Sequence, residues 1–198
     1  MSALPQSFSG SVHSVLTQER WYALHVRSRH DKLVSASLRV RGMESFLPLY
    51  RSRRRWSDRT RVMDLPLFPG YVFCRFDPST RSGVLATSGV IDVVRVGFEP
   101  EPVETSEIDA IRLVVESPLF SEPYPGLVKG QRVTMSGGPL RGLTGSLLEI
   151  RNSVRLALSV ELLGRSVIVE IERDWAALYE PATLATWHQH SASTSGLE

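Results

Sequence analysis

Arginine side chains are concentrated in one short stretch of the sequence. Residues 27–61 contain eleven Arg and Lys side chains and three acidic ones, whereas the whole chain has a formal net charge of +2. Arginine pairs with phosphate in bidentate fashion, and an indole ring can stack on an unpaired base. The stretch therefore predicts a nucleic-acid-binding surface, the alternative being a solvated loop whose tryptophan packs on a sheet. The residues expected to contact nucleic acid are Arg51, Arg53, Arg54, Arg55, Trp56, Arg59 and Arg61.

Aromatic residues flank a Pro-Gly pair shortly after this stretch. Proline fixes its own φ, and glycine adopts turn conformations closed to other residues, so Phe68 and Tyr71 should stand at a tight turn before a strand. Together with Trp21 and Tyr22 they could form an apolar pocket for a partner, although aromatic residues beside a turn are usually core residues. The candidate site comprises Trp21, Tyr22, Phe68, Pro69, Gly70 and Tyr71.

Patterns for catalysis or metal binding are weak. His25, His30 and Asp31 have no third ligand at suitable spacing, and Cys74 lies inside an expected strand, as a buried thiol would. The sequence contains neither a G-x-x-x-x-G-K-[ST] phosphate loop nor a nucleophile elbow. We therefore expect no catalytic residues, no metal and no cofactor, in a protein that is not an enzyme.

The composition is typical of a folded, soluble globular protein. The 198 residues are 42% hydrophobic and 22% charged, close to the globular average. No apolar run is long enough to span a bilayer, the first 20 residues do not read as a secretory signal, and one cysteine cannot form a disulfide framework. We expect a cytoplasmic monomer that does not bind membranes.

Alternating strands and helices predict an N-terminal domain over residues 19–116. The even-numbered residues of 22–26 should share one face of the first strand, with Trp21 on the other, and the first helix should bury Leu33, Ala36 and Val40. Strands are expected at 20–27, 44–50, 70–77 and 90–96, and helices at 30–41, 80–88 and 105–116.

A proline-rich linker and a second domain are expected to follow. Three prolines and a glycine in 117–128 favour a semi-rigid connector. Four short strands, at 131–135, 143–150, 153–160 and 166–171, predict a small β-barrel over 129–179. The polar ends, 1–18 and 180–198, are expected to be a flexible leader and a disordered tail. The predicted fold class is therefore α+β, an α/β sandwich followed by a small β-barrel.

Three motifs in the expected order resemble one protein family. The motifs are W-Y-A-L-H-V at 21–26, L-P-L-F-P-G-Y-V-F at 65–73 and G-P-L-R-G-L-T-G at 138–145. They resemble the N-terminal (NGN) domain and the C-terminal, SH3-like KOW domain of NusG-type transcription elongation factors. The closer resemblance is to the UpxY-type, RfaH-related branch, through S-R-H-D-K at 28–32, F-L-P-L at 46–49 and R-W-S-D-R at 55–59.

The resemblance implies roles for the candidate residues. The aromatic site would grip the clamp of RNA polymerase, and the arginine-rich stretch would face the non-template DNA strand. In the KOW domain, Leu163, Gly164 and Arg165 would form a docking loop for a ribosomal protein or for Rho. General factors carry an aromatic residue where Leu163 stands, and this departure favours a specialised paralogue.

The implied function is transcription elongation and antitermination. The chain would bind RNA polymerase and promote read-through of long operons, of the exopolysaccharide or capsule type by resemblance. Two alternatives stay open. One is a general NusG-type elongation factor coupled to Rho or the ribosome, and the other, of a different class, is a KOW-containing nucleic-acid or ribosome-binding module.

Overall fold

The structure is a computed structural model that describes residues 19–56, 59–150 and 153–179. The side chains of residues 53–60 and of Ile150 are outside this description. The predicted leader (1–18) and tail (180–198) also lie outside the described residues.

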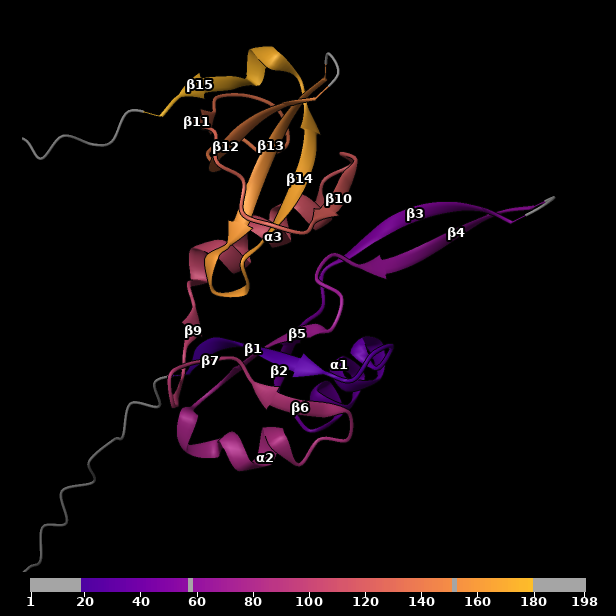
Figure 1. Cartoon of the computed structure of the whole chain (residues 1–198), viewed down its shortest axis with the longest axis vertical. Coiled ribbons are helices and arrows are strands. Elements are labelled where there is room, and N and C mark those ends of the chain that lie inside the picture. Colours follow the sequence, from indigo (N-terminus) through magenta and orange to yellow (C-terminus); the bar gives the residue numbers. More distant parts are fainter. Residues whose placement is uncertain (1–18, 57–58, 151–152, 180–198) are drawn as a thin grey trace, which may run out of the picture.

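An antiparallel sheet forms the centre of the N-terminal domain (Figure 1). Its order is β2 (Glu44–Phe46), β5 (Tyr71–Phe76), β1 (Arg20–Val26) and β6 (Val90–Val93), and β9 (Pro102–Val103) also pairs with β1. The predicted alternation along β1 is confirmed. Tyr22, Leu24 and Val26 pack in one hydrophobic cluster with residues of the first two helices, and Trp21 and Ala23 pack in another.

Among the described residues, three α-helices pack on the sheet. Helices α1 (Asp31–Val40) and α2 (Arg81–Leu85), the latter preceded by a 3-10 turn at Pro78–Thr80, contribute to the Tyr22 cluster. Helix α3 (Thr105–Glu116) buries Ile108, Ile111 and Val114 in the Trp21 cluster. A small hairpin, β7 (Arg95–Val96) and β8 (Glu99–Pro100), precedes β9.

The buried face predicted for α1 is wrong. Leu33 and Val40 are exposed, and the helix buries Asp31, Val34, Ser35 and Leu38 instead. Two of these residues are polar, and both have tertiary partners. The Asp31 carboxylate accepts a hydrogen bond from the Gly70 amide, and the Ser35 hydroxyl bonds the Ser45 hydroxyl at 3.0 Å. Because two residues of the buried face are polar, the hydrophobic periodicity of the sequence does not reveal which face of the helix is buried.

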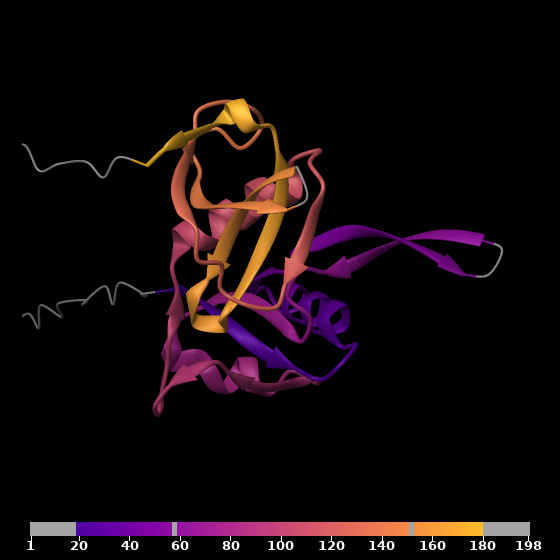
Figure 2. The ribbon, with the colours of Figure 1, turned by 45° about the horizontal axis from the view of Figure 1, so that its top comes forward.

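The arginine-rich stretch forms a two-stranded antiparallel ribbon rather than a loop. Strand β3 (Leu49–Trp56) pairs with β4 (Arg59–Pro66) along its whole length, from Leu49 opposite Pro66 to Trp56 opposite Arg59. The ribbon projects away from both domains in two views of the molecule (Figures 1 and 2). At its base the Leu67 amide donates to the Pro48 carbonyl at 2.9 Å, which continues the pairing of the two strands into buried residues of the N-terminal domain.

The C-terminal domain is built on one six-stranded antiparallel sheet. Its order is β10 (Ser121–Tyr124), β14 (Arg165–Ile171), β13 (Ser153–Val160), β12 (Thr144–Ile150), β11 (Gln131–Met135) and β15 (Ala176–Leu178). The four predicted strands are present as β11–β14, and the strands wrap around one core (Figure 1). Strand β10 lies within the predicted linker, so that part of the linker belongs to this sheet.

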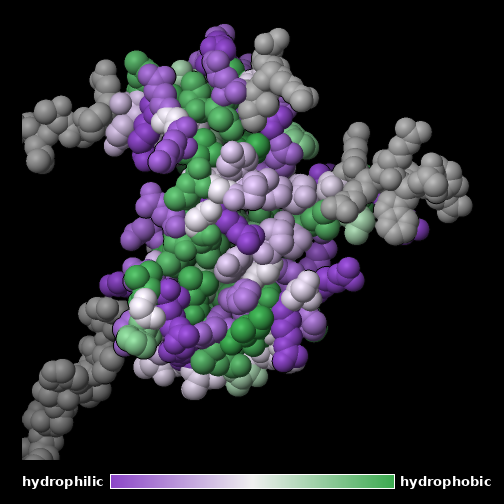
Figure 3. All heavy atoms as spheres, viewed as in Figure 1, coloured by the Kyte–Doolittle hydropathy of each residue, from purple (hydrophilic) through white to green (hydrophobic). Residues whose placement is uncertain are grey.

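The two domains pack against each other. One cluster of buried residues contains Trp21, Phe68 and Ile108 of the N-terminal domain together with Met135 and Val160 of the C-terminal domain. Helix α3 lies between the two sheets (Figures 1 and 2). Hydrophobic residues continue from one domain to the other across the face in Figure 3, bordered by hydrophilic ones. The predicted α+β class is confirmed, with a sheet-rich second domain.

Candidate functional site

The Pro-Gly pair forms a type II turn. The Tyr71 amide donates to the Phe68 carbonyl at 3.0 Å, and Gly70, in the third position, has φ +86°. A type II turn requires a positive φ at that position, which glycine adopts without the steric cost of a Cβ atom. The Val26 amide donates to the Gly70 carbonyl at 2.9 Å, and the Gly70 amide donates to Asp31 Oδ1 at 2.8 Å. The turn is therefore held by β1 and by the first residue of α1.

The candidate aromatic residues differ in exposure. Phe68 is fully buried and meets Phe73 edge-to-face with ring centroids 5.6 Å apart. Trp21 is buried as well, with the Arg112 guanidinium 5.2 Å from its ring centroid. Pro69 is exposed and Tyr71 is half-buried. The turn thus presents Pro69 and Tyr71, while Phe68 anchors it in the core.

Tyr22 does not belong to the same surface as Trp21. It lies on the opposite face of β1, where its ring packs against Phe76 with centroids 4.7 Å apart. Neighbouring residues of a strand point to opposite faces of a sheet, so the two side chains cannot line one pocket. The prediction that grouped them is corrected in this respect.

The predicted docking loop of the C-terminal domain contacts the turn. A 3-10 turn at Glu161–Leu163 ends at Gly164, whose φ is +59°, and Arg165 begins β14. Arg165 Nη1 donates to the Pro69 carbonyl at 3.3 Å, and its guanidinium lies 5.1 Å from the centroid of the Tyr71 ring. Two surfaces predicted separately from the sequence therefore meet in this structure.

The ribbon carries exposed basic residues on its described part. Arg51 and Arg61 are exposed, and neither makes an ion pair with another described residue. The backbone register of the ribbon pairs position 54 with position 61. Exposed arginines without an acidic partner, such as Arg51 and Arg61, are free to pair with a polyanion.

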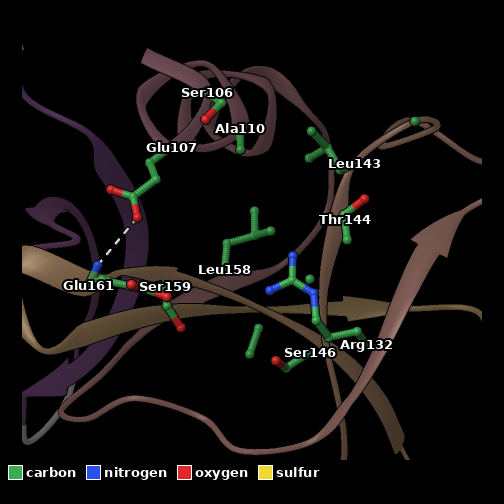
Figure 4. A pocket seen from close by; sticks show the side chains of 13 residues that line it. Ser106, Glu107, Ala110, Arg132, Leu143, Thr144, Ser146, Leu158, Ser159 and Glu161 are labelled. Carbon is green, nitrogen blue, oxygen red and sulfur yellow. Dashed lines mark hydrogen bonds between the residues drawn. The ribbon is translucent and has the colours of Figure 1, made fainter. Parts of the chain in front are cut away.

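A cavity of about 410 Å³ lies between α3 and the C-terminal sheet (Figure 4). Ser106, Glu107 and Ala110 line one side, and Arg132 and Leu158 line the other. Glu107 Oε1 accepts a hydrogen bond from the Glu161 amide at 3.4 Å, across the domain boundary. Burial raises the pKa of Glu107 above its ordinary value. The hydrogen bond from the Glu161 amide lowers the pKa by a smaller amount, and the charges of Glu161 and Glu104 raise it. None of the partner-binding residues predicted from the sequence lines this cavity.

Groups suited to catalysis or metal binding are scarce in the described part of the chain. Burial raises the pKa of the Cys74 thiol to about 12, which keeps it protonated near neutral pH. Within residues 19–56, 59–150 and 153–179, no three His, Cys, Asp or Glu side chains are grouped as metal ligands. The helices of the same described ranges are all too short or too polar to cross a bilayer.

Sequence reasoning missed the part that Asp31 plays in the site. The sequence suggests Asp31 as a weak base or metal ligand, whereas the structure buries it and shows that it holds the turn through Gly70. A usable signal was the position of an acidic residue at the start of a helix, but its partner 39 positions away could not be identified from spacing.

Comparisons with known proteins find similarity to NusG proteins. Residues 19–112 match the model of the family NusG, described as "Transcription termination factor nusG". The chain is 29% identical over 172 residues to the transcription termination/antitermination protein NusG of Pseudomonas aeruginosa, covering 78% of this chain and 95% of that protein. It is 25% identical over 173 residues to the Staphylococcus aureus protein of the same name, covering 79% and 93%.

A solved structure supports the fold. The chain is similar to a structure that describes the domain interaction in Thermotoga maritima NusG, with a TM-score of 0.52 and 21% identity. The similarity covers 82% of this chain and 98% of that one. At this identity the structure is evidence for the fold alone. Residues 19–112 thus match the NusG family model, and most of the chain is similar in sequence to the two NusG proteins.

Proposed function

We propose that this chain is a transcription elongation and antitermination factor that binds the clamp of RNA polymerase through the Phe68–Tyr71 turn. The observation that carries the proposal is the turn itself, which a buried Phe68 anchors while Pro69 and Tyr71 stay at the surface. A rigid turn ending in an aromatic ring can receive the tip of a partner helix at little cost in conformational entropy. It lies inside the segment that matches the family model.

The ribbon supplies the proposed contact with nucleic acid. It projects from the N-terminal domain, and it carries the arginines expected to pair with phosphates (Figure 1). The proposed ligand is the non-template DNA strand exposed by the polymerase. Trp56 would stack on an unpaired base of that strand.

Binding through the turn requires the C-terminal domain to move. Arg165 occupies the Pro69 carbonyl and covers the Tyr71 ring. Its loop is the proposed docking surface for a ribosomal protein or for Rho. Opening the contact would free the two surfaces together.

The finer proposal is a specialised paralogue that acts on one or a few long operons. It is supported by the motifs at 28–32, 46–49 and 55–59 and by Leu163, where general factors have an aromatic residue. Transcript profiling after deletion of the gene tests it. A specialist changes one or a few long transcripts, and a general factor changes most of them.

The polymerase contact is tested by replacing Tyr71 with Ala. Loss of an aromatic anchor at the centre of an interface costs about 2 kcal/mol, or roughly 30-fold in affinity, so polymerase binding should weaken by about that much. Tyr124→Ala is the matched control, because Tyr124 is a half-buried tyrosine on β10, in the C-terminal sheet. Equal affinity of Tyr71→Ala, Tyr124→Ala and the unchanged protein in a polymerase titration would contradict the assignment. No binding by the unchanged protein would favour a free-standing nucleic-acid or ribosome-binding module.

A further inference from the structure

We propose that Asp31 is a positioning residue for the polymerase contact, because its carboxylate fixes the orientation of the central peptide of the Phe68–Tyr71 turn. This inference rests on the proposed function for its binding consequence. The hold of Asp31 on the turn can be measured on the free protein.

The central peptide, between Pro69 and Gly70, distinguishes the two common turn types. Types I and II differ mainly by a flip of this peptide, and a planar trans peptide points its N–H and its C=O in opposite directions. Here the Gly70 N–H donates to Asp31 Oδ1 at 2.8 Å. The Pro69 carbonyl therefore points away from Asp31, where it accepts from Arg165 at 3.3 Å. A flipped peptide would turn the Pro69 carbonyl toward a carboxylate, and the two acceptors would repel each other.

The surroundings of Asp31 indicate that its main structural role is to accept the hydrogen bond from the Gly70 amide. Asp31 is only 7% exposed, and the Gly70 amide is the single hydrogen-bond donor to its side chain among the described residues. Burying a carboxylate is costly unless it is well paired, so a fold keeps one where it fixes a geometry. Val34 and Leu38, on the same face of α1, contribute apolar side chains to the Tyr22 cluster, whereas Asp31 does not.

The backbone just before Asp31 adopts a strained conformation that positions Asp31. Arg29 has φ +62° and is the one non-glycine residue with a positive φ in the described ranges. It stands in a tight turn closed by the His30 amide and the Arg27 carbonyl at 3.0 Å, between β1 and α1. Such strain persists where the surrounding structure requires it. The turn brings the first residue of α1 opposite Gly70.

The first test measures the turn in the free, full-length protein. Asp31→Ala should speed hydrogen exchange of the Gly70 amide about tenfold, the equivalent of one hydrogen bond, and Asp31→Asn should keep it slow because an amide oxygen still accepts. Asp77→Ala is the matched control, because Asp77 Oδ1 also accepts from a backbone amide at 2.8 Å, that of Ser79. The control should leave Gly70 unchanged. An unchanged Gly70 exchange rate in Asp31→Ala would overturn the inference.

The second test measures polymerase binding by the same variants. Asp31→Ala should weaken it about tenfold, with Asp31→Asn within about threefold of the unchanged protein, as expected for loss and retention of one ordering bond. If Tyr71→Ala weakens binding and Asp31→Ala does not, this inference alone fails. If neither weakens it, the polymerase contact of the proposed function is wrong and the positioning role fails with it. Should Asp31→Ala not stay folded by thermal melting, Asp31→Glu replaces it, since one extra methylene displaces the carboxylate from Gly70.

Discussion

The Phe68–Tyr71 turn and the β3–β4 ribbon are held by the fold in different ways. The turn is fixed by a buried phenylalanine and by backbone bonds to Val26 and Asp31. The ribbon is held by the pairing of its own two strands and, at its base, by the bond between Leu67 and Pro48. Side chains along β4, such as Met63, remain exposed.

Because of this difference, substitutions in the two regions should affect stability and binding to different extents. A change in the turn alters the packing of the core as well as any surface that the turn presents. A change far out on the ribbon alters charge and contact area and leaves the core untouched. Substitutions in the two regions should therefore give different combinations of effects, and each combination can be measured.

The largest expected effect is that of Phe68→Ala. Removal of a fully buried phenylalanine ring leaves a cavity, so the free energy of unfolding should fall by about 3–5 kcal/mol. Urea denaturation followed by circular dichroism measures the change. On the ribbon, Met63→Ala removes a side chain that is 44% exposed and should change the value by less than about 0.5 kcal/mol. Equal losses in both variants would show that the ribbon is packed as tightly as the turn.

Phe68 consequently cannot report on polymerase binding by itself. A weakened interaction in Phe68→Ala would combine lost contacts with a destabilised domain. Tyr71, at the surface end of the same turn, is the cleaner probe. This distinction follows from burial, which the order of residues in F-P-G-Y does not specify.

The next effect concerns the ribbon and should appear only in binding. Replacing Arg53, Arg54 and Arg55 with Gln removes up to three phosphate contacts. Each contact to a single strand contributes about 0.7 to the slope of log affinity against log salt, so the slope should fall by about 2. The measurement is a salt titration on a transcription scaffold with an open non-template strand, in the presence of polymerase.

A matched triple variant in the C-terminal domain provides the control for charge. Arg132, Arg141 and Arg173 are exposed there, and replacing all three with Gln removes the same net charge without touching the ribbon. The control should keep the salt slope of the unchanged protein. If both triple variants lower the slope equally, the effect is one of overall charge, and the ribbon makes no specific contact.

Local rules predicted much of the fold. Alternation along 20–26 assigned the two faces of β1, and the short alternating segments gave β11 to β14. The Pro-Gly pair predicted a turn because φ preferences are properties of the residues themselves. These features depend on neighbours in the sequence, which is why sequence alone could specify them.

Features that depend on distant partners were not predicted. The inner face of α1 contains Asp31 and Ser35, whose hydrogen bonds are made with Gly70 and Ser45. Strand β10 forms in a proline-rich segment because β14 offers it an edge, and an edge strand tolerates Pro123. The ribbon lacks an apolar alternation, because it pairs in solvent rather than over a core. The candidate site was found by motif, but the exposure of each ring was decided by packing.

The smallest expected effect is a pH dependence at the contact between the domains. Burial raises the pKa of Glu107 from its ordinary value of 4.5. The Glu107 carboxylate therefore binds a proton more tightly in the folded protein than in the unfolded chain. The free energy of unfolding attributable to Glu107 should therefore decrease as pH rises from below 4.5 toward the raised pKa. Glu107→Gln removes this titration. The free energy of unfolding of the variant should therefore rise relative to that of the unchanged protein over this pH interval, and the relative gain should level off above it. Glu116→Gln, on an exposed residue at the other end of α3, is the control and should give no such trend. Denaturation curves at several pH values measure the effect, and a difference independent of pH would mean that Glu107 is as hydrated in the folded protein as in the unfolded chain.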